Sequence, residues 1–491
     1  MKIRAKQLLC FCLALLLVLG LTSCGGSGST GGKKAELLSM DARPDAPSEI
    51  PEGLDIDWNY RYTFAELEGQ LAQLAETYPD ITSLYSIGTS WQERDLWCME
   101  LTNKAIPAGE KTGIGVFANI HGGERESASS AMYTAWWLAL CSDDDYVKGL
   151  LDNYIIYVIP VINPDGYEQS FVINNRPNLR PRDANGDNIP YSDPYTDIDG
   201  DGFIATLYRG MVDDTPSRDL PVFGMESPDW DENGILGDDP RMSGIDMNRT
   251  FDYQWNRYDI ETKDGQQVGN VNWTTAGTAP ATEPEIKALQ QFLYEHEIDA
   301  LVSLHTGIQS VLYPWCYRAY DANDPDDAEI PFMKETAAKM AQVFQDYTGR
   351  GFYSMSSNED YPTAAELIDY AYGRYNIHAY TIEVYSPGKS EDGDISACKW
   401  ENTMPEAKWV FYSRDEIRDV LGLDPDAITD SEGVGLSADE GLWFYTSPTN
   451  QMVNRAPEEQ DVMVRGCRDA ILTMIESEPS GSGYQNPGYY K

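Results

Sequence analysis

The chain has little positive charge and very few histidines. Its 491 residues include 36 Lys and Arg against 80 Asp and Glu, a formal net charge of −44, and 4 His. Nucleic acids are bound by clustered Lys and Arg, so this composition argues against a nucleic-acid partner. It argues equally against binding of anionic lipid by the folded surface. Wholesale disorder is excluded, because 42% hydrophobic residues with 12 Trp and 31 Tyr suffice for a sizeable core.

Paired cysteines are also scarce. The sequence has 8 Cys and no CxxC pair, and the first three, Cys10, Cys12 and Cys24, lie at the N-terminus. An odd number is left after them, without a recognisable spacing. A disulfide scaffold is therefore not indicated, although one or two bridges stay open.

The N-terminus carries an export signal. A basic start is followed by an apolar run over residues 8–21, which is too short to span a bilayer comfortably and is typical of a secretory signal. Leu21-Thr22-Ser23-Cys24 resembles the lipobox of bacterial lipoproteins, where the signal is removed before a cysteine that receives lipid. We expect a signal peptide over 1–23, a lipidated Cys24 opening a flexible linker over 24–56, and a cell-envelope lipoprotein held to a membrane through that lipid. A plain signal peptide cut nearby is the alternative.

Beyond residue 56 the sequence alternates between helical and strand patterns. Apolar residues at helical spacing predict helices over 62–78, 127–140 and about 458–476. Apolar runs predict strands over 81–87, 113–120, 154–162, 300–304 and 379–385. Buried strands separated by helices indicate an α/β domain with a mixed central β-sheet and helices on both faces.

We assign this domain to residues 57–480, followed by a loose tail over 481–491. Two stretches interrupt its pattern. One is an Asp-rich insertion at about 183–240, and the other is a loop-like region at about 386–450.

Candidate metal ligands follow two of the predicted strands. His121-Gly122-Gly123-Glu124 comes directly after the 113–120 strand, and His305 follows the 300–304 strand. Two His and one Glu, with a fourth position left to water, make a standard catalytic zinc site. A short HxxE motif is common by chance, and either His alone is better explained as a hydrogen-bonding residue. Their joint position favours the metal, because open α/β sheets place their sites at the carboxyl ends of strands.

Several further motifs, in order along the chain, resemble the zinc carboxypeptidases of the carboxypeptidase A type. They are Asn163-Pro164-Asp165-Gly166, the segment from Gly244 to Arg249, Thr282-Glu283-Pro284-Glu285, and a tyrosine and glutamate separated as Tyr361 and Glu383 are. The resemblance covers most of residues 57–480. It implies a metallocarboxypeptidase that hydrolyses the C-terminal peptide bond of peptides or proteins with a free terminal carboxylate. It also implies one Zn²⁺ per chain, held by His121, Glu124 and His305.

The resemblance assigns roles to five more residues. Glu383 would be the general base that takes a proton from a zinc-activated water. Asn248 and Arg249 would bind the substrate's terminal carboxylate, since a guanidinium fork matches its two oxygens. Tyr361 would close over the substrate, and Asp246 would orient His121. The plainer alternatives are a structural salt bridge for Arg249, ordinary packing for Tyr361 and a local turn cap for Asp246.

Two assignments are less direct. The family supplies an oxyanion-stabilising arginine downstream of the NPDG turn, where this chain offers Arg176, Arg180 and Arg182. By spacing Arg180 fits best and Arg182 second. For specificity, Ile368 near the side-chain pocket favours apolar terminal residues, whereas an inward Glu366 would favour Lys or Arg. We favour apolar substrates, because Glu366 could equally point away.

The Asp-rich insertion contains possible calcium ligands. Asp197, Asp199 and Asp201 alternate as oxygen ligands do around Ca²⁺. An EF-hand would need a glutamate at its twelfth position, where residue 208 is Tyr. A structural Ca²⁺ and a solvated acidic loop both stay open.

Two other functions also stay open. One is a zinc amidase or peptidase acting on cell-wall peptides, because a fold does not fix its substrate. The other is a catalytically inactive, tethered binding lipoprotein, which would require the zinc ligands, Glu383 and Tyr361 to occur together by accident.

Overall fold

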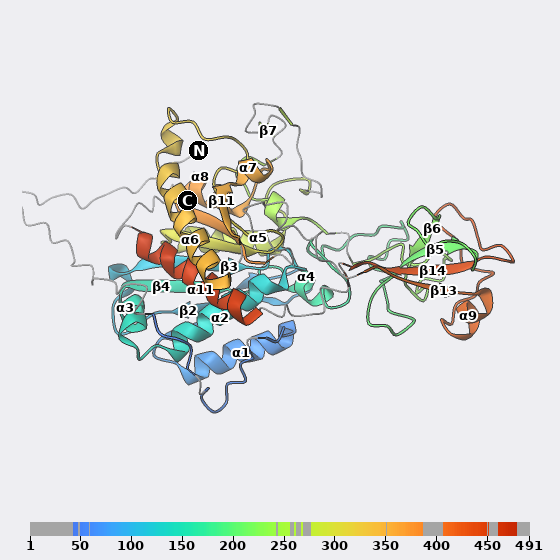
Figure 1. The fold of residues 1–491 in the computed structure, drawn as a ribbon, viewed down its shortest axis with the longest axis horizontal. Helices are drawn as coiled ribbons and strands as arrows, with labels where there is room; N and C mark the ends of the chain where they lie inside the picture. Colours follow the sequence, from blue (N-terminus) through green and yellow to red (C-terminus); the bar gives the residue numbers. More distant parts are fainter. Residues whose placement is uncertain are drawn as a thin grey trace, which may run out of the picture. The chain divides into compact units, whose positions relative to one another are not determined.

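The computed structural model (Figure 1) describes residues 43–47, 50–57, 59–241, 244–255, 260–261, 267–268, 276–349, 351–385, 406–448, 450 and 460–478. The chain divides into compact units 1–35 and 36–491, and every described residue belongs to the second. The expected signal peptide, Cys24 and the tail 481–491 lie outside the described residues. Among the residues described, none of the helices has the length and apolar character to cross a membrane.

An eight-stranded mixed sheet forms the centre of the larger part of the fold. Its strand order is β1-β2-β4-β3-β9-β12-β10-β11. The neighbours β4, β3, β9 and β12 run parallel, whereas β1, β2 and β10 introduce antiparallel pairs. The strands are β1 Thr82–Thr89, β2 Asp95–Leu101, β3 Thr112–Ala118, β4 Tyr154–Ile159, β9 Ala300–His305, β10 Ser310–Tyr313, β11 Tyr353–Ser356 and β12 His378–Glu383. The predicted mixed α/β sheet is confirmed.

Helices cover both faces of this sheet. They are α1 Phe64–Thr77, α2 Arg125–Leu140, α3 Asp145–Asn153, α4 Pro164–Gln169, α5 Pro284–Glu295, α6 Ile330–Thr348, α7 Ser357–Asp360, α8 Leu367–Tyr375 and α11 Gln460–Ser477. Single-turn 3₁₀ helices lie at η2 Ala108–Glu110, η3 Met247–Arg249 and η4 Pro325–Asp327. The three predicted helices correspond to α1, α2 and α11, with ends that differ by at most two residues.

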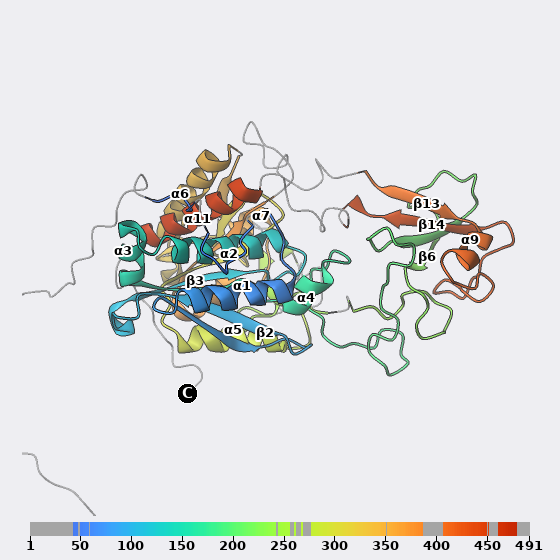
Figure 2. The same ribbon diagram turned by 90° about the horizontal axis from the view of Figure 1, so that it is seen from below.

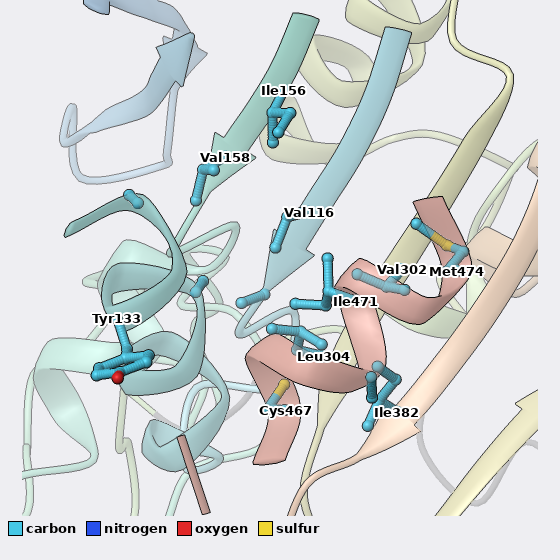
Figure 3. Packing of buried hydrophobic residues seen from close by; sticks show 14 of the residues in the cluster. Val116, Tyr133, Ile156, Val158, Val302, Leu304, Ile382, Cys467, Ile471 and Met474 are labelled. Atoms are coloured by element: carbon cyan, nitrogen blue, oxygen red, sulfur yellow. The ribbon is translucent and has the colours of Figure 1, made fainter. Parts of the chain in front are cut away.

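Alternate residues of the central strands supply two separate cores. On one face Val116 and Val158 join the cluster that includes α2, α6 and α11, as Figure 3 shows around Ile471 and Met474. On the other face Phe117 packs in the cluster that includes α5 and α8. This burial on both sides explains why β3 and β4 are nearly continuous apolar runs instead of alternating patterns. It also holds the carboxyl ends of β3, β9 and β12 in fixed positions.

A second sheet combines the two stretches that interrupted the sequence pattern. Its antiparallel order is β13-β14-β5-β6, with β5 Thr206–Gly210 and β6 Val222–Met225 from the insertion, and β13 Lys408–Tyr412 and β14 Gly441–Thr446 from the later region (Figure 2). Helix α9 Arg414–Asp419 contributes Ile417 to a core of its own with Leu207, Leu442 and Phe444. The description of 386–450 as loop-like is therefore wrong for residues 406–448. A two-residue pair, β7 Ile260–Glu261 and β8 Gln267–Val268, completes the strands of the described residues.

Candidate active site

The turn after β3 is shaped by close backbone approach. Asn119 adopts a positive φ of 54°, and its side-chain amide donates to the carbonyls of Gly122 and Glu124. A Cβ on Gly122 would lie 2.2 Å from the carbonyl carbon of Gly166, and one on Gly123 would lie 2.1 Å from Asn174 Oδ1. The backbone of Gly166 excludes a side chain at Gly122, and a side chain at Gly123 would require Asn174 to move. The two glycines therefore allow His121 and Glu124 to project from one tight turn.

His121, Glu124 and His305 converge at the ends of β3 and β9, which are neighbours in the sheet. Nδ1 of His121 lies 2.8 Å from Glu124 Oε1 and 3.2 Å from Nδ1 of His305, which lies 3.0 Å from Glu124 Oε2. The two histidines are 2% exposed and Glu124 is 8% exposed. The structure thus brings together the three residues that the sequence predicted.

The outer nitrogen of each ring has its own partner. His121 Nε2 lies 3.2 Å from Asp246 Oδ1, and His305 Nε2 lies 3.0 Å from Ser303 Oγ. Nε2 of His121 thus faces a carboxylate, which can only accept, while Nδ1 faces the other two candidate ligands. Asp246 lies where the sequence placed it. Ser303 was missed, although its place two residues before His305 on β9 points it to the same face of the sheet.

This donor set fits a zinc ion. Tetrahedral zinc with metal–ligand bonds of ~2.0–2.1 Å holds its ligands about 3.3 Å apart, close to the 2.8 to 3.2 Å separations among the three side chains. Two imidazoles and a carboxylate, each with a further hydrogen-bonding partner, are the ligands that catalytic zinc sites use, and the partner of Glu124 is the backbone nitrogen of Thr306.

Glu383 ends β12 beside this group. It is in register with His305 on the neighbouring parallel strand, and the nitrogen after it, on Val384, donates to the His305 carbonyl at 2.8 Å. Its Oε2 is buried and has no hydrogen-bond partner among the described residues. Burial, the largest influence, raises the pKa of Glu383 to about 8, with the charge of His305 opposing it. A carboxyl group in this state is suited to exchanging a proton.

The arginine beside the three candidate ligands is Arg176, whereas Arg180, which the sequence spacing favoured, lies away from them. Arg176 Nε lies 2.7 Å from Asp246 Oδ2, and its Nη1 lies 3.6 Å from Glu124 Oε1. Arg180 instead pairs with the buried Glu283 at 3.0 Å and lies over the ring of Trp91. The backbone carbonyl of Arg176 accepts a hydrogen bond from Gly122, which fixes its segment against the turn that carries the candidate ligands.

Asp246 also ties the candidate ligands to a buried Asn-Arg pair. It caps the 3₁₀ helix η3 by accepting from the backbone nitrogen of Asn248 with the same Oδ1 that faces His121. Its pKa is well below the usual value, because the charges of Arg176 and His121 outweigh the burial that would raise it. Arg249, 4% exposed, donates to the Tyr361 hydroxyl at 3.0 Å. The Tyr361 ring itself is 43% exposed.

Glu366 points into this region, contrary to the expectation that it could lie away from it. Its Oε1 lies 2.9 Å from Arg249 Nη1, its Oε2 is 3.4 Å from Asn248 Nδ2, and the residue is 7% exposed. Ile368, two residues further along, is 1% exposed and packs in the core cluster on the α5 and α8 face. The basis for favouring apolar substrates is therefore removed.

Two predicted motifs support the site without joining it. Asp165 of the NPDG turn is fully buried and receives hydrogen bonds from Ser90 Oγ and Arg94 Nη1, both at 2.7 Å. Glu283 receives hydrogen bonds from Asn178 and Arg180. The contacts of Glu283, which precedes α5, tie the loop around residues 175–180, which carries Arg176, to the start of that helix.

The acidic insertion gathers like charges. Asp197 and Asp199 come together with the fully buried Glu226, a residue the sequence did not suggest, while Asp201 is not part of that group. Two further acidic groups form in the same region: Asp183, Asp187 and Asp239, and Asp193, Asp229 and Asp231.

Comparison with known proteins agrees with the motifs. The sequence matches the zinc carboxypeptidase family over residues 67–404, and the chain therefore belongs to that family, whose carboxypeptidases are zinc enzymes. Zinc carboxypeptidase A 1 of Drosophila melanogaster is 24% identical over 356 residues, covering 70% of this chain and 67% of the relative. Carboxypeptidase A6 of Mus musculus is 23% identical over 340 residues, covering 68% and 62%.

Among solved structures, thrombin activatable fibrinolysis inhibitor matches with 17% identity and a TM-score of 0.48, over 66% of both chains. The chain spans 62 to 67% of the length of these relatives and of the solved chain. The family match over residues 67–404 confirms the resemblance inferred from the sequence.

Proposed function

We propose that this protein is a zinc-dependent metallocarboxypeptidase that hydrolyses the C-terminal peptide bond of peptides or proteins. The observation that carries the proposal is the position of Asp246, which contacts His121 and the backbone of Asn248 through one oxygen. An exopeptidase must hold its carboxylate receptor at a fixed distance from the reacting bond. A single buried carboxylate joining a metal ligand to the Asn248–Arg249 pair meets that requirement.

His121, Glu124 and His305 would hold the zinc ion, which would supply Lewis acidity for the attacking water and the peptide carbonyl. Glu383 takes a proton from the water at its buried Oε2 and gives it to the departing amine. Arg176, whose side chain is 39% exposed, donates to the carbonyl oxygen as negative charge develops. Arg249 and Asn248 bind the terminal carboxylate, and the exposed Tyr361 ring covers the bound residue.

The test is C-terminal trimming of a mixed peptide set by the purified protein, followed by mass. We expect loss of one residue at a time from the C-terminus, and no loss when the peptides are C-terminally amidated. Activity should disappear with a zinc chelator and return on addition of zinc. Internal cleavage, or equal trimming of the amidated peptides, would contradict the exopeptidase assignment.

We further propose that the insertion binds a structural Ca²⁺ through Asp197, Asp199 and Glu226. One oxygen from each of these carboxylates lies within 4.8 Å of the others, and a bound cation would offset their mutual repulsion. Glu226 takes the place of the glutamate that the EF-hand pattern lacked, although it follows Asp197 by 29 positions in the chain. Calorimetric titration of chelator-treated protein with Ca²⁺ tests this. We expect the Ca²⁺-binding isotherm of the Glu226→Gln variant to differ from that of wild type. Identical isotherms would exclude Glu226 as a ligand.

We also propose that the enzyme is exported and anchored to a membrane through lipid on Cys24. The support is the apolar segment and the sequence Leu-Thr-Ser-Cys that precedes the proposed cleavage site. Mass spectrometry of membrane-extracted protein should find a modified N-terminal Cys24, and Cys24→Ala should release the protein into the soluble fraction. An intact N-terminus in extracted protein would contradict the proposal.

A further inference from the structure

Arg125 begins α2, directly after the candidate ligand Glu124, and is buried without a counter-charge. The residue is 1% exposed, and no carboxylate of the described residues forms an ion pair with it. Its Nε and Nη2 are buried and have no hydrogen-bond partner among the described residues. Because an unpaired buried charge is costly, a guanidinium group in this state indicates that a further group binds to it.

The side chains around Arg125 do not supply a negative charge. Its guanidinium carbon lies 4.1 Å from the centroid of the Phe171 ring, which covers one face but cannot accept from the in-plane N–H groups. Burial raises the pKa of the nearby Tyr167, so its hydroxyl, which donates to the Tyr62 carbonyl at 2.5 Å, stays neutral. Burial also lowers the pKa of Arg125 to about 10, which still leaves this side chain charged at neutral pH.

A second buried arginine adds to the positive charge. Arg61, whose side chain is 7% exposed, forms an ion pair with Glu126, the neighbour of Arg125 on α2. The pKa of Arg61 is lowered to about 9, first by burial and then by the charge of Arg125. Since Glu126 pairs with Arg61, the three side chains Arg61, Arg125 and Glu126 carry one net positive charge.

A cavity among α1, α2, α4 and α11 adjoins these arginines. Its lining includes Tyr62, which follows Arg61 in the chain, and Ser129, which lies one helical turn after Arg125 and donates to the Arg125 carbonyl at 3.3 Å. Tyr167, which lies near both arginines, lines the same cavity. Space for a small ion is therefore found next to the excess positive charge.

We propose that this region binds a monovalent anion of the size of chloride, held by the Nε–H and Nη2–H groups of Arg125. These two donors lie parallel on one edge of the guanidinium group, so both can meet a single acceptor. One negative charge balances the excess on Arg61, Arg125 and Glu126, whereas a divalent oxyanion would leave an excess of the opposite sign. The bound ion stabilises the first turn of α2 and takes no part in the proposed peptide hydrolysis.

Crystals of the full chain soaked in sodium bromide would locate the ion directly, because bromide replaces chloride and scatters X-rays anomalously. We expect an anomalous peak in contact with Nε and Nη2 of Arg125. A map without a peak at Arg125 would overturn the proposal.

Thermal denaturation in sodium chloride and in sodium gluconate at equal ionic strength measures the effect of the ion, since gluconate is too large for the site. We expect the melting temperature of wild type to be roughly 2–4 °C higher in chloride. Arg125→Met removes the buried charge and should abolish this difference without lowering the melting temperature in gluconate. Arg418→Met is the matched control and should keep the difference, because Arg418 is half exposed and pairs with Asp415 and Asp426.

An equal chloride effect in wild type and Arg125→Met would assign the effect to the rest of the surface and contradict the proposal. A bromide peak at Arg125 without any chloride effect on wild type would mean an adventitious ion only, which also overturns it. If Arg125→Met does not fold, the bromide map and the melting temperatures of wild type still decide the matter.

Discussion

The two sheets of this protein hold their charged residues in different ways. At the carboxyl ends of β3, β9 and β12, charges of opposite sign alternate: His121 contacts Asp246, which contacts Arg176. In the insertion that contributes β5 and β6, charges of one sign gather, as Asp197, Asp199 and Glu226 do. The first arrangement is internally balanced and can be preorganised for chemistry. The second is the arrangement for which we propose a structural Ca²⁺.

The largest effect on catalysis should come from a substitution of Glu383, at the end of β12. Glu383→Gln removes the group that accepts the proton but keeps its size, so we expect kcat to fall about a thousandfold or more while KM changes little. Steady-state kinetics on a cleaved peptide provides the measurement, with zinc content and circular dichroism as controls. Loss of less than tenfold would show that another group carries the proton.

The second-largest effect should distinguish the role of Arg176 from that of Arg180. Arg176→Ala should lower kcat by a factor on the order of 10²–10³, as expected for loss of a donor to the developing oxyanion. Arg180→Ala is the matched control, because Arg180 pairs with Glu283 outside the site. We expect it to reduce stability and leave kcat within a few-fold. The reverse ranking in the same kinetic assay would restore the assignment made from sequence spacing.

These arginines also mark how far the sequence could predict the site. His121, Glu124 and His305 were found because each follows a buried strand, and strand ends fall together once the sheet order is set. Arg176 lies in an irregular segment, where spacing along the chain does not determine position in space. The available signal was the Gly122-Gly123 pair, since two adjacent glycines after a strand indicate that another segment lies against them.

The second sheet was missed for a related reason. Its strands come from two regions separated by almost 200 positions in the chain, so neither region alone shows a hydrophobic core. Strand β13 has partly exposed aromatic residues, Trp409 and Phe411, on one side and alternates weakly. Glu226 was overlooked as a partner of the Asp197 loop because only the fold brings the two together.

Selective removal of each metal should show that the active site and the acidic insertion have different roles. A zinc chelator should abolish peptidase activity, whereas a calcium-selective chelator should lower the melting temperature and leave kcat/KM unchanged after zinc is restored. The stability lost should be about 2.7 kcal/mol at a Ca²⁺ concentration a hundred times Kd. Thermal denaturation with and without Ca²⁺, using Glu226→Gln as the control that no longer responds, is the measurement. Loss of catalysis on calcium removal would show that the insertion and the active site do not act independently.

The smallest effect concerns a charge pair of the large sheet that lies away from the proposed chemistry. His378 begins β12 and is 4% exposed, and its Nδ1 lies 2.6 Å from Oε2 of the buried Glu478. Burial alone would lower the pKa of His378, but the hydrogen bond and charge of Glu478 outweigh it and raise the pKa above 6.5. The folded state therefore binds this proton more tightly than the unfolded state.

The pair should stabilise the fold fully below pH 6.5, the unfolded value, and less as the pH rises through the folded pKa. We expect His378→Gln to cost about 1 kcal/mol more of unfolding free energy at pH 5.5 than at pH 9. Urea denaturation at the two pH values measures this, with His296→Gln as the control, because His296 bonds a backbone carbonyl. An equal cost at both pH values would mean that His378 is neutral in the fold. In that case β12, which ends at Glu383, would have no charge pair between His378 and Glu478 at its start.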